Sequence, residues 1–134
     1  MTALSTYAEM KILDHLFKNT SYTSPNAYIG AFTSDPTDSA SGTECSGSGY
    51  ARVRIDDKMS SATSGADNSS ITNSSAITFS AASGGAWGTV THIGIFDASS
   101  SGNLLAHGAL GASKTISDGD TLQINASALT ITID

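Results

Sequence analysis

The pattern of apolar and polar positions predicts one helix, near the start of the chain. Between residues 4 and 19, apolar side chains recur three and four positions apart and form a single stripe, which consists of Ala8, Ile12, Leu13, Leu16 and Phe17. Thr6 and Glu9 have the spacing of a capping box, and Asn19 fits a C-terminal cap. Because so short a helix is marginal alone, we expect its stripe to pack on the rest of the domain or on a neighbouring subunit.

The rest of the chain, from residue 27 to residue 134, has the patterns of β-strands. From Tyr50 to Ile55 the alternation is strict and places Tyr50, Arg52 and Arg54 on one face. Asp118-Gly119 is a dipeptide favoured in tight hairpins. Apolar runs and alternation predict strands at 27–32, 50–55, 75–79, 90–96, 104–110, 114–116, 120–124 and 129–133.

Two long polar segments, 33–49 and 56–73, interrupt these strands. The second is nearly free of large apolar residues, so we expect it to be a polar excursion that is mobile in isolation. About seven or eight short strands with one terminal helix predict a mainly β fold. We expect one domain, residues 1–134, built as an antiparallel β-sandwich or open barrel.

Composition and charge narrow the function classes. Only 13% of the residues are charged and the net charge is −6, which argues against nucleic-acid binding because that requires a basic surface. No apolar run approaches the roughly 20 residues of a membrane-spanning helix, and the N-terminal segment lacks the pattern of a signal peptide. The single cysteine, Cys45, fits folding in a bacterial cytoplasm.

The histidines and aspartates that could form a metal or catalytic site are more simply explained by structural roles. If a hairpin is centred near Ser100, His92 and His107 lie almost opposite each other, with Asp97 near the turn. This set could resemble a two-histidine, one-carboxylate metal site, but the acid lies several residues from both rings, and we favour strand histidines with structural hydrogen bonds. The chain has no Gly-x-Ser-x-Gly motif, and its aspartates occur mostly at turns and strand ends. We therefore expect no enzymatic activity, no cofactor and no metal.

The only tryptophan, Trp87, lies in the glycine-rich stretch GGAWG. A tryptophan in such a loop could stack on a sugar or fill a partner's pocket. It could also fill the core beside the strong strand that follows, and we favour this second interpretation.

Several stretches together resemble a known family. The most specific is WGTVTHIGIFDA, followed by GNLLAHGAL, and the helix LSTYAEMKILDHLF and the closing SKTISDGDTLQINASALTITID keep the same order. This order is similar to that of small virion proteins of tailed phages, which are labelled tail-fibre-like or decoration proteins. The resemblance covers nearly the whole chain. It implies a structural virion component with a β-sandwich and no catalytic residues.

The choice between head and tail rests on architecture. A fibre needs a shaft of repeats or a coiled coil, and the sequence contains neither. We therefore expect a capsid decoration (cement) protein that binds the major capsid protein as a homotrimer. The alternatives are a tail, baseplate or short-fibre module that contacts other tail proteins or host glycan, and a carbohydrate-binding domain. The expected contact residues are Ile12, Leu13, Leu16, Phe17, Arg52, Arg54 and Trp87.

Overall fold

The N-terminal helix is present and begins at a different cap from the predicted one. The computed structural model describes residues 3–133. Helix α1 spans Thr6–Phe17, and its N-cap is Ser5, whose hydroxyl oxygen accepts a hydrogen bond from Ala8 N at 3.2 Å. The predicted Thr6–Glu9 capping box is therefore wrong by one residue. Asn19 follows the helix with φ 55°, the left-handed conformation expected at a helix C-terminus.

Ser5 starts the helix because it is fixed to the sheet. Its backbone N–H donates to the carbonyl of Leu105 at 2.9 Å, and its buried hydroxyl donates to the carbonyl of Leu104. The two residues before it, Ala3–Leu4, form a short strand, β1. The predicted start at residue 4 is therefore too early, because residue 4 already belongs to the sheet.

The main sheet has five antiparallel strands in the order β1-β8-β7-β2-β3. Their bounds are Ala3–Leu4 for β1, Leu104–Ile116 for β8, Gly88–Phe96 for β7, Tyr28–Phe32 for β2 and Val53–Arg54 for β3. The predicted strands at 27–32 and 90–96 are confirmed. The segments 104–110 and 114–116 form one long strand instead of two, and the strand predicted at 50–55 is reduced to two residues.

Two smaller sheets complete the β structure. One has the order β10-β5-β4 and the other pairs β6 with β9. The bounds are Thr63–Ser64 for β4, Ser69–Thr72 for β5, Ile77–Thr78 for β6, Gln123–Ile124 for β9 and Thr130–Ile133 for β10. The Asp118-Gly119 turn exists, with Gly119 at φ 88°, but the strand after it pairs with β6 and not with the strand before it.

The predicted polar excursion at 56–73 is partly ordered secondary structure. It contains a short 3-10 helix, Asp56–Lys58, followed by the β4–β5 hairpin. Its strand β5 pairs along its length with β10, from Thr72 opposite Thr130 to Ser69 opposite Ile133. Because backbone hydrogen bonds to a distant strand hold this segment, its polar composition did not reveal its structure.

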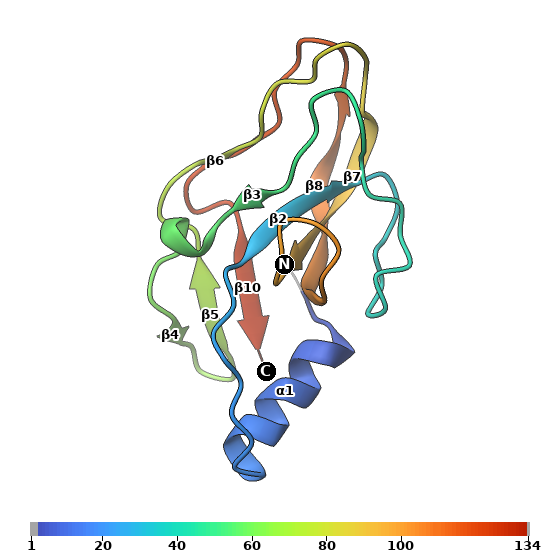
Figure 1. Ribbon diagram of the computed structural model, residues 1–134. Coiled ribbons are helices and arrows are strands. Elements are labelled where there is room, and N and C mark those ends of the chain that lie inside the picture. The colour runs from blue at the N-terminus through green and yellow to red at the C-terminus, as the bar shows by residue number, and fades with distance from the viewer. Residues whose placement is uncertain (1–2, 134) are drawn as a thin grey trace.

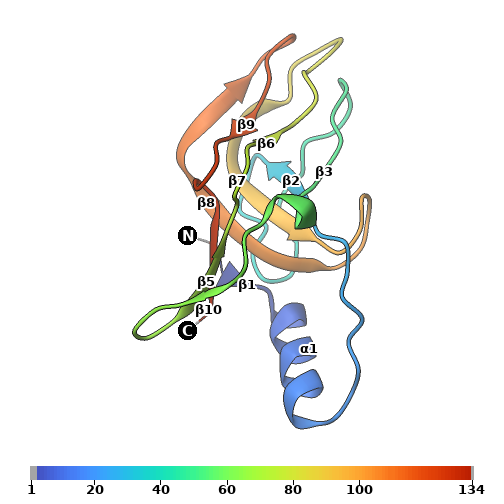
Figure 2. The ribbon, with the colours of Figure 1, turned by 90° about the vertical axis from the view of Figure 1, so that its left-hand side faces the viewer.

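The sheets enclose one main core and leave the helix outside it. Fully buried members of the core include Ile29, Ile55, Ile77, Phe79 and Val90. Figures 1 and 2 show α1 projecting from one end of the β structure, with the following segment running back beside it. The predicted fold class is confirmed: the fold is mainly β, with one helix near the N-terminus. Its antiparallel sheets do not close into a barrel, which is consistent with a sandwich. Within residues 3–133, no helix is long and apolar enough to cross a membrane.

Candidate functional site

Four of the five exposed large hydrophobic side chains among residues 3–133 lie on α1. Met10, Leu13, Leu16 and Phe17 are 60, 57, 64 and 81% exposed, and we call these four side chains the apolar helix face. Of the other predicted stripe residues, Ala8 is buried and Ile12 is half-buried. The stripe is therefore split between the protein body and solvent. Ala8 and Ile12 thus lie toward the rest of the domain, and packing of Leu13, Leu16 and Phe17 on a neighbouring subunit stays a prediction.

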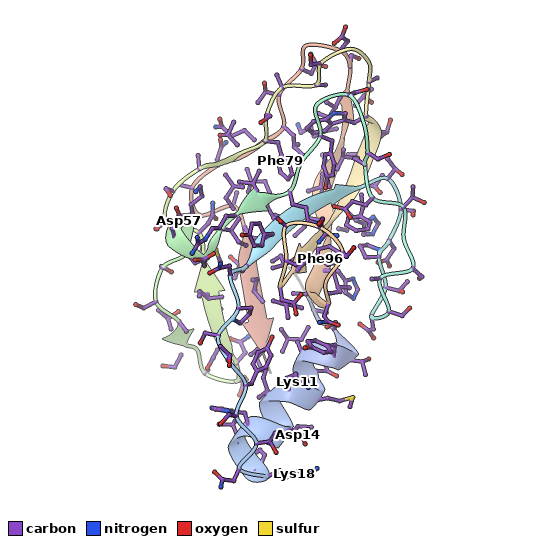
Figure 3. All side chains as sticks on the ribbon, in the orientation of Figure 1. Lys11, Asp14, Lys18, Asp57, Phe79 and Phe96 are labelled. Atoms are coloured by element: carbon purple, nitrogen blue, oxygen red, sulfur yellow. The ribbon has the colours of Figure 1, made fainter. Side chains whose placement is uncertain are left out.

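Few polar contacts hold the outer end of the helix. Thr20 N donates to the carbonyl of Asp14 at 3.2 Å, and Tyr22 N donates to Nδ1 of His15 at 3.3 Å. Figure 3 shows Lys11, Asp14 and Lys18 along this helix, far from Phe79 in the core. The helix is thus attached at its first turn and braced by the segment that follows it.

Arg52 lies inside the protein. Its side chain is 6% exposed and forms a two-point ion pair with Glu44, with Nε–Oε1 at 2.8 Å and Nη2–Oε2 at 2.7 Å. Nη1 donates to the carbonyls of Ala98 and Ser101 at 3.0 and 2.7 Å. The guanidinium also lies 3.5 Å from the ring centroid of Phe96. The polar atoms of Arg52 are thus used within the chain, which corrects its predicted role as a contact residue.

Tyr50 extends this buried network. Its hydroxyl donates to Oε1 of Glu44 at 2.7 Å and accepts a hydrogen bond from Ala31 N at 2.9 Å. Burial, together with the neighbouring Glu44 carboxylate, strongly raises the pKa of Tyr50. The hydroxyl therefore stays protonated and holds the 44–52 segment against β2.

Arg54 lies on the surface. Its side chain is 51% exposed and pairs with Asp56 at 2.8 Å, and its Nη2 also donates to Oδ1 of Asn26 at 3.0 Å. The hydrogen bonds from Arg54 are the main reason why the pKa of Asp56 is lowered to about 2. Arg54 remains a predicted contact residue, because half of its side chain is open to solvent.

Trp87 is a core residue. It is 6% exposed, and its Nε1 donates to the carbonyl of Ser48 at 3.1 Å. Its ring makes edge-to-face contacts with Tyr50 and Phe79, with centroid separations of 5.2 and 6.1 Å. This is the core interpretation that the sequence favoured. A ring enclosed in this way does not present a face to a sugar or a partner, so its predicted role as a contact residue is corrected.

The two strand histidines lie on one face of the sheet but not opposite each other. His92 is opposite Ala109, and His107 is opposite Gly94, so the rings are diagonal neighbours. Asp97 bonds instead to Asn103 within the hairpin loop, with Oδ1–N at 2.7 Å. Two other acids, Asp35 and Asp38, lie beside His107 in the structure. Sequence spacing could not reveal these contacts. Across residues 3–133, no three histidine, cysteine or acidic side chains are grouped so that they could hold a metal ion.

A comparison with known families identifies the family of the chain. A family model described as podophage GP4 fiber I protein gp80 matches residues 3–132. The chain belongs to this family. It is therefore a structural component of a phage virion, and the resemblance to small tailed-phage virion proteins is confirmed. A search of curated proteins gave no match.

Proposed function

We propose that the protein is a structural module of a podophage tail fibre, without catalytic activity, attached to its neighbours through the apolar helix face. The observation that carries this proposal is the fibre-family match over nearly the whole described chain. It favours the tail alternative over the capsid decoration role that we expected from the sequence. The partners in this proposal are other tail proteins and further copies of the chain, including the expected homotrimer.

The exposure of the helix supports an assembled state. Each of the four apolar side chains on the helix face is more than half exposed on one short helix. Burying a side chain of this size contributes about 1.5–3 kcal/mol, so covering the face in an assembly is favourable. Contiguous exposed apolar surface of this kind marks interaction sites on soluble proteins.

The other two functions have weaker support. A capsid decoration protein would place the same helix face on the major capsid protein, and no observation on the described residues favours that partner. The carbohydrate-binding alternative relied on Trp87, whose side chain is buried in the core. Contact with host glycan would therefore have to use other residues.

Copy number and position in the particle test the proposal. Quantitative mass spectrometry of purified virions would measure the ratio of this protein to the major capsid protein, and gold-labelled antibodies would mark its location by electron microscopy. A tail-fibre module is expected in a small number of copies, with label at the tail. A ratio near one copy per capsid subunit, with label over the head, would overturn the tail proposal in favour of decoration.

A further inference from the structure

The exposed side of α1 carries a carboxylate among its apolar side chains. Glu9 precedes Leu13 by four residues and Leu16 by seven, so the three side chains lie on the same side of the helix. Glu9 is exposed, and its carboxylate forms no ion pair or hydrogen bond with residues 3–133. This charge is therefore free to pair with a cation on whatever covers the apolar helix face.

A second copy of the chain has little apolar surface to offer besides the same helix. Among residues 3–133, the only exposed large hydrophobic side chain outside α1 is Ile133, which is 47% exposed. The β structure buries its other large apolar side chains wholly or partly in its own core. Covering the helix face with another copy therefore requires helices that pack face to face.

Glu9 makes face-to-face packing between copies unfavourable. In a parallel arrangement around a symmetry axis, each Glu9 would lie level with the Glu9 of its neighbour, and the like charges would repel each other. In an antiparallel pair, Glu9 would lie beside the last turn of the partner helix, where the exposed carbonyls carry a partial negative charge. Lys18, the C-cap residue, lies about 140° around the helix axis from Leu13, so it is poorly placed to offset this repulsion.

The size of the face also favours a partner that encloses it. From Met10 to Phe17 the face extends only about 10 Å along the helix axis. A stable interface buries about 800 Å² on each partner, and two helices that touch along so short a line bury much less. A groove contacts the same side chains from several directions. Met10, Leu13 and Phe17 have the i, i+3 and i+7 spacing of the anchors that amphipathic helices place in apolar grooves.

We propose that the apolar helix face docks in an apolar groove of a different virion protein, and that a lysine or arginine of this groove pairs with Glu9. This inference rests on the proposed attachment through the helix face and narrows the partner to a protein other than the chain itself. The apolar anchors supply most of the binding free energy. The charge pair at one end fixes the direction in which the helix lies in the groove.

Photo-crosslinking in assembled virions identifies what covers the helix face. Phe17 is replaced by the photoreactive residue p-benzoylphenylalanine, which keeps an aromatic side chain at this 81% exposed position. After irradiation of purified virions, mass spectrometry should find position 17 linked to a virion protein of different sequence. A link to another copy of this chain would overturn the proposal and leave the fibre assignment standing. A link to the major capsid protein would support a different partner and overturn the fibre assignment.

Competition for assembly measures the role of the Glu9 charge. Wild type and variant are supplied together during infection, and mass spectrometry compares their ratio in virions with their ratio in the infected cells. Glu9→Lys places a like charge against the basic residue of the groove, so we expect virions to favour the wild type by about tenfold or more. The matched control, Asp67→Lys, reverses a charge at an exposed position between β4 and β5 and should be incorporated equally. Equal incorporation of Glu9→Lys would overturn the proposed pairing.

Charge reversal on the partner separates this pairing from an effect on the helix itself. A lysine in the first turn also opposes the helix dipole, and circular dichroism of the purified Glu9→Lys variant measures any loss of helix. Each lysine and arginine near the crosslinked site of the partner is then changed to glutamate. One of these changes should restore the incorporation of Glu9→Lys and reduce that of the wild type. If none restores it, Glu9 acts only within its own helix and the proposed pairing is wrong.

Discussion

At the scale of single residues, the two arginines of one predicted strand face have opposite roles. Arg52 and Arg54 alternate with apolar residues in the same way, yet their side chains are 6 and 51% exposed. Removing one partner of a buried ion pair leaves the other charge uncompensated. We expect Arg52→Ala to lower the free energy of unfolding by about 3 kcal/mol. Arg54→Ala, the matched control, removes only a surface ion pair and should lower it by much less, because such pairs contribute little.

Urea unfolding provides the measurement, because the buried Trp87 reports loss of the core by fluorescence. Equal unfolding midpoints for the two variants would contradict the structural role of Arg52. The sequence could not separate these arginines. Their difference depends on Glu44, eight residues away, and on the carbonyls of the 97–103 loop, which only the folded chain brings together.

A second residue-scale prediction concerns Cys45. This side chain is 5% exposed and burial raises the pKa of its thiol, so both access and thiolate formation are suppressed. We expect Ellman's reagent to label Cys45 in urea at the rate of an ordinary thiol, and in native buffer only as fast as the protein unfolds. Rapid labelling of the folded protein would show that the thiol is accessible and would contradict this structure.

At the scale of elements, Asn73 joins the end of β5 to the segment before β10. Its fully buried side chain donates to the carbonyls of Ser75 and Asn125 at 2.9 and 2.8 Å and accepts from Leu129 N at 2.9 Å. Asn73→Ala leaves these groups without partners, so we expect a loss of about 3 kcal/mol in the free energy of unfolding. Asn68→Ala, at an exposed position between β4 and β5, should change it by less than about 0.5 kcal/mol. Urea unfolding compares the two variants, and similar losses in both would refute this role for Asn73.

Asp56 links the end of the helix connector to the 3-10 helix. Its carboxylate accepts from Ala27 N at 3.1 Å and pairs with Arg54, and its pKa is lowered to about 2 from an ordinary value of 3.8. A lowered pKa in the folded state means that the stabilisation is present above about pH 4 and is lost as the pH falls toward 2. We therefore expect the melting temperature of the wild type to fall more between pH 4 and pH 2 than that of Asp56→Asn. An equal fall in calorimetry would argue against this contribution.

Periodicity predicted the elements whose stability depends on local pattern. The helix and the strands β2, β7 and β10 follow from apolar spacing. The β4–β5 hairpin could not be predicted, because Ser and Thr side chains give no apolar signal and its pairing partner, β10, lies about sixty residues later. The predicted helix stripe contained three of the four exposed residues but missed Met10, because it joined residues that face the body with residues that face solvent.

At the scale of the whole molecule, the β structure buries its own apolar side chains, whereas helix α1 leaves four of its apolar side chains exposed. The core side chains and the buried Arg52–Glu44 pair find partners within the chain. Helix α1 projects away from the β structure (Figures 1 and 2), and the side chains of its apolar face are exposed and do not contribute to the buried core. Substitutions on this face should therefore affect assembly and leave folding intact.

The triple variant Leu13→Ser, Leu16→Ser and Phe17→Ser tests this separation of roles. Each apolar side chain buried in an interface contributes about 2 kcal/mol, so losing three should weaken attachment about ten-thousandfold or more. We expect the purified variant to keep the wild-type β signal in circular dichroism and its unfolding midpoint, but to be absent from virions grown with it as the only copy. The control is Ile133→Ser, which removes a 47% exposed apolar side chain from β10 and should be incorporated normally. Normal incorporation of the triple variant would exclude the helix face as the attachment site, because the particle would then assemble without the surface that the β structure leaves uncovered.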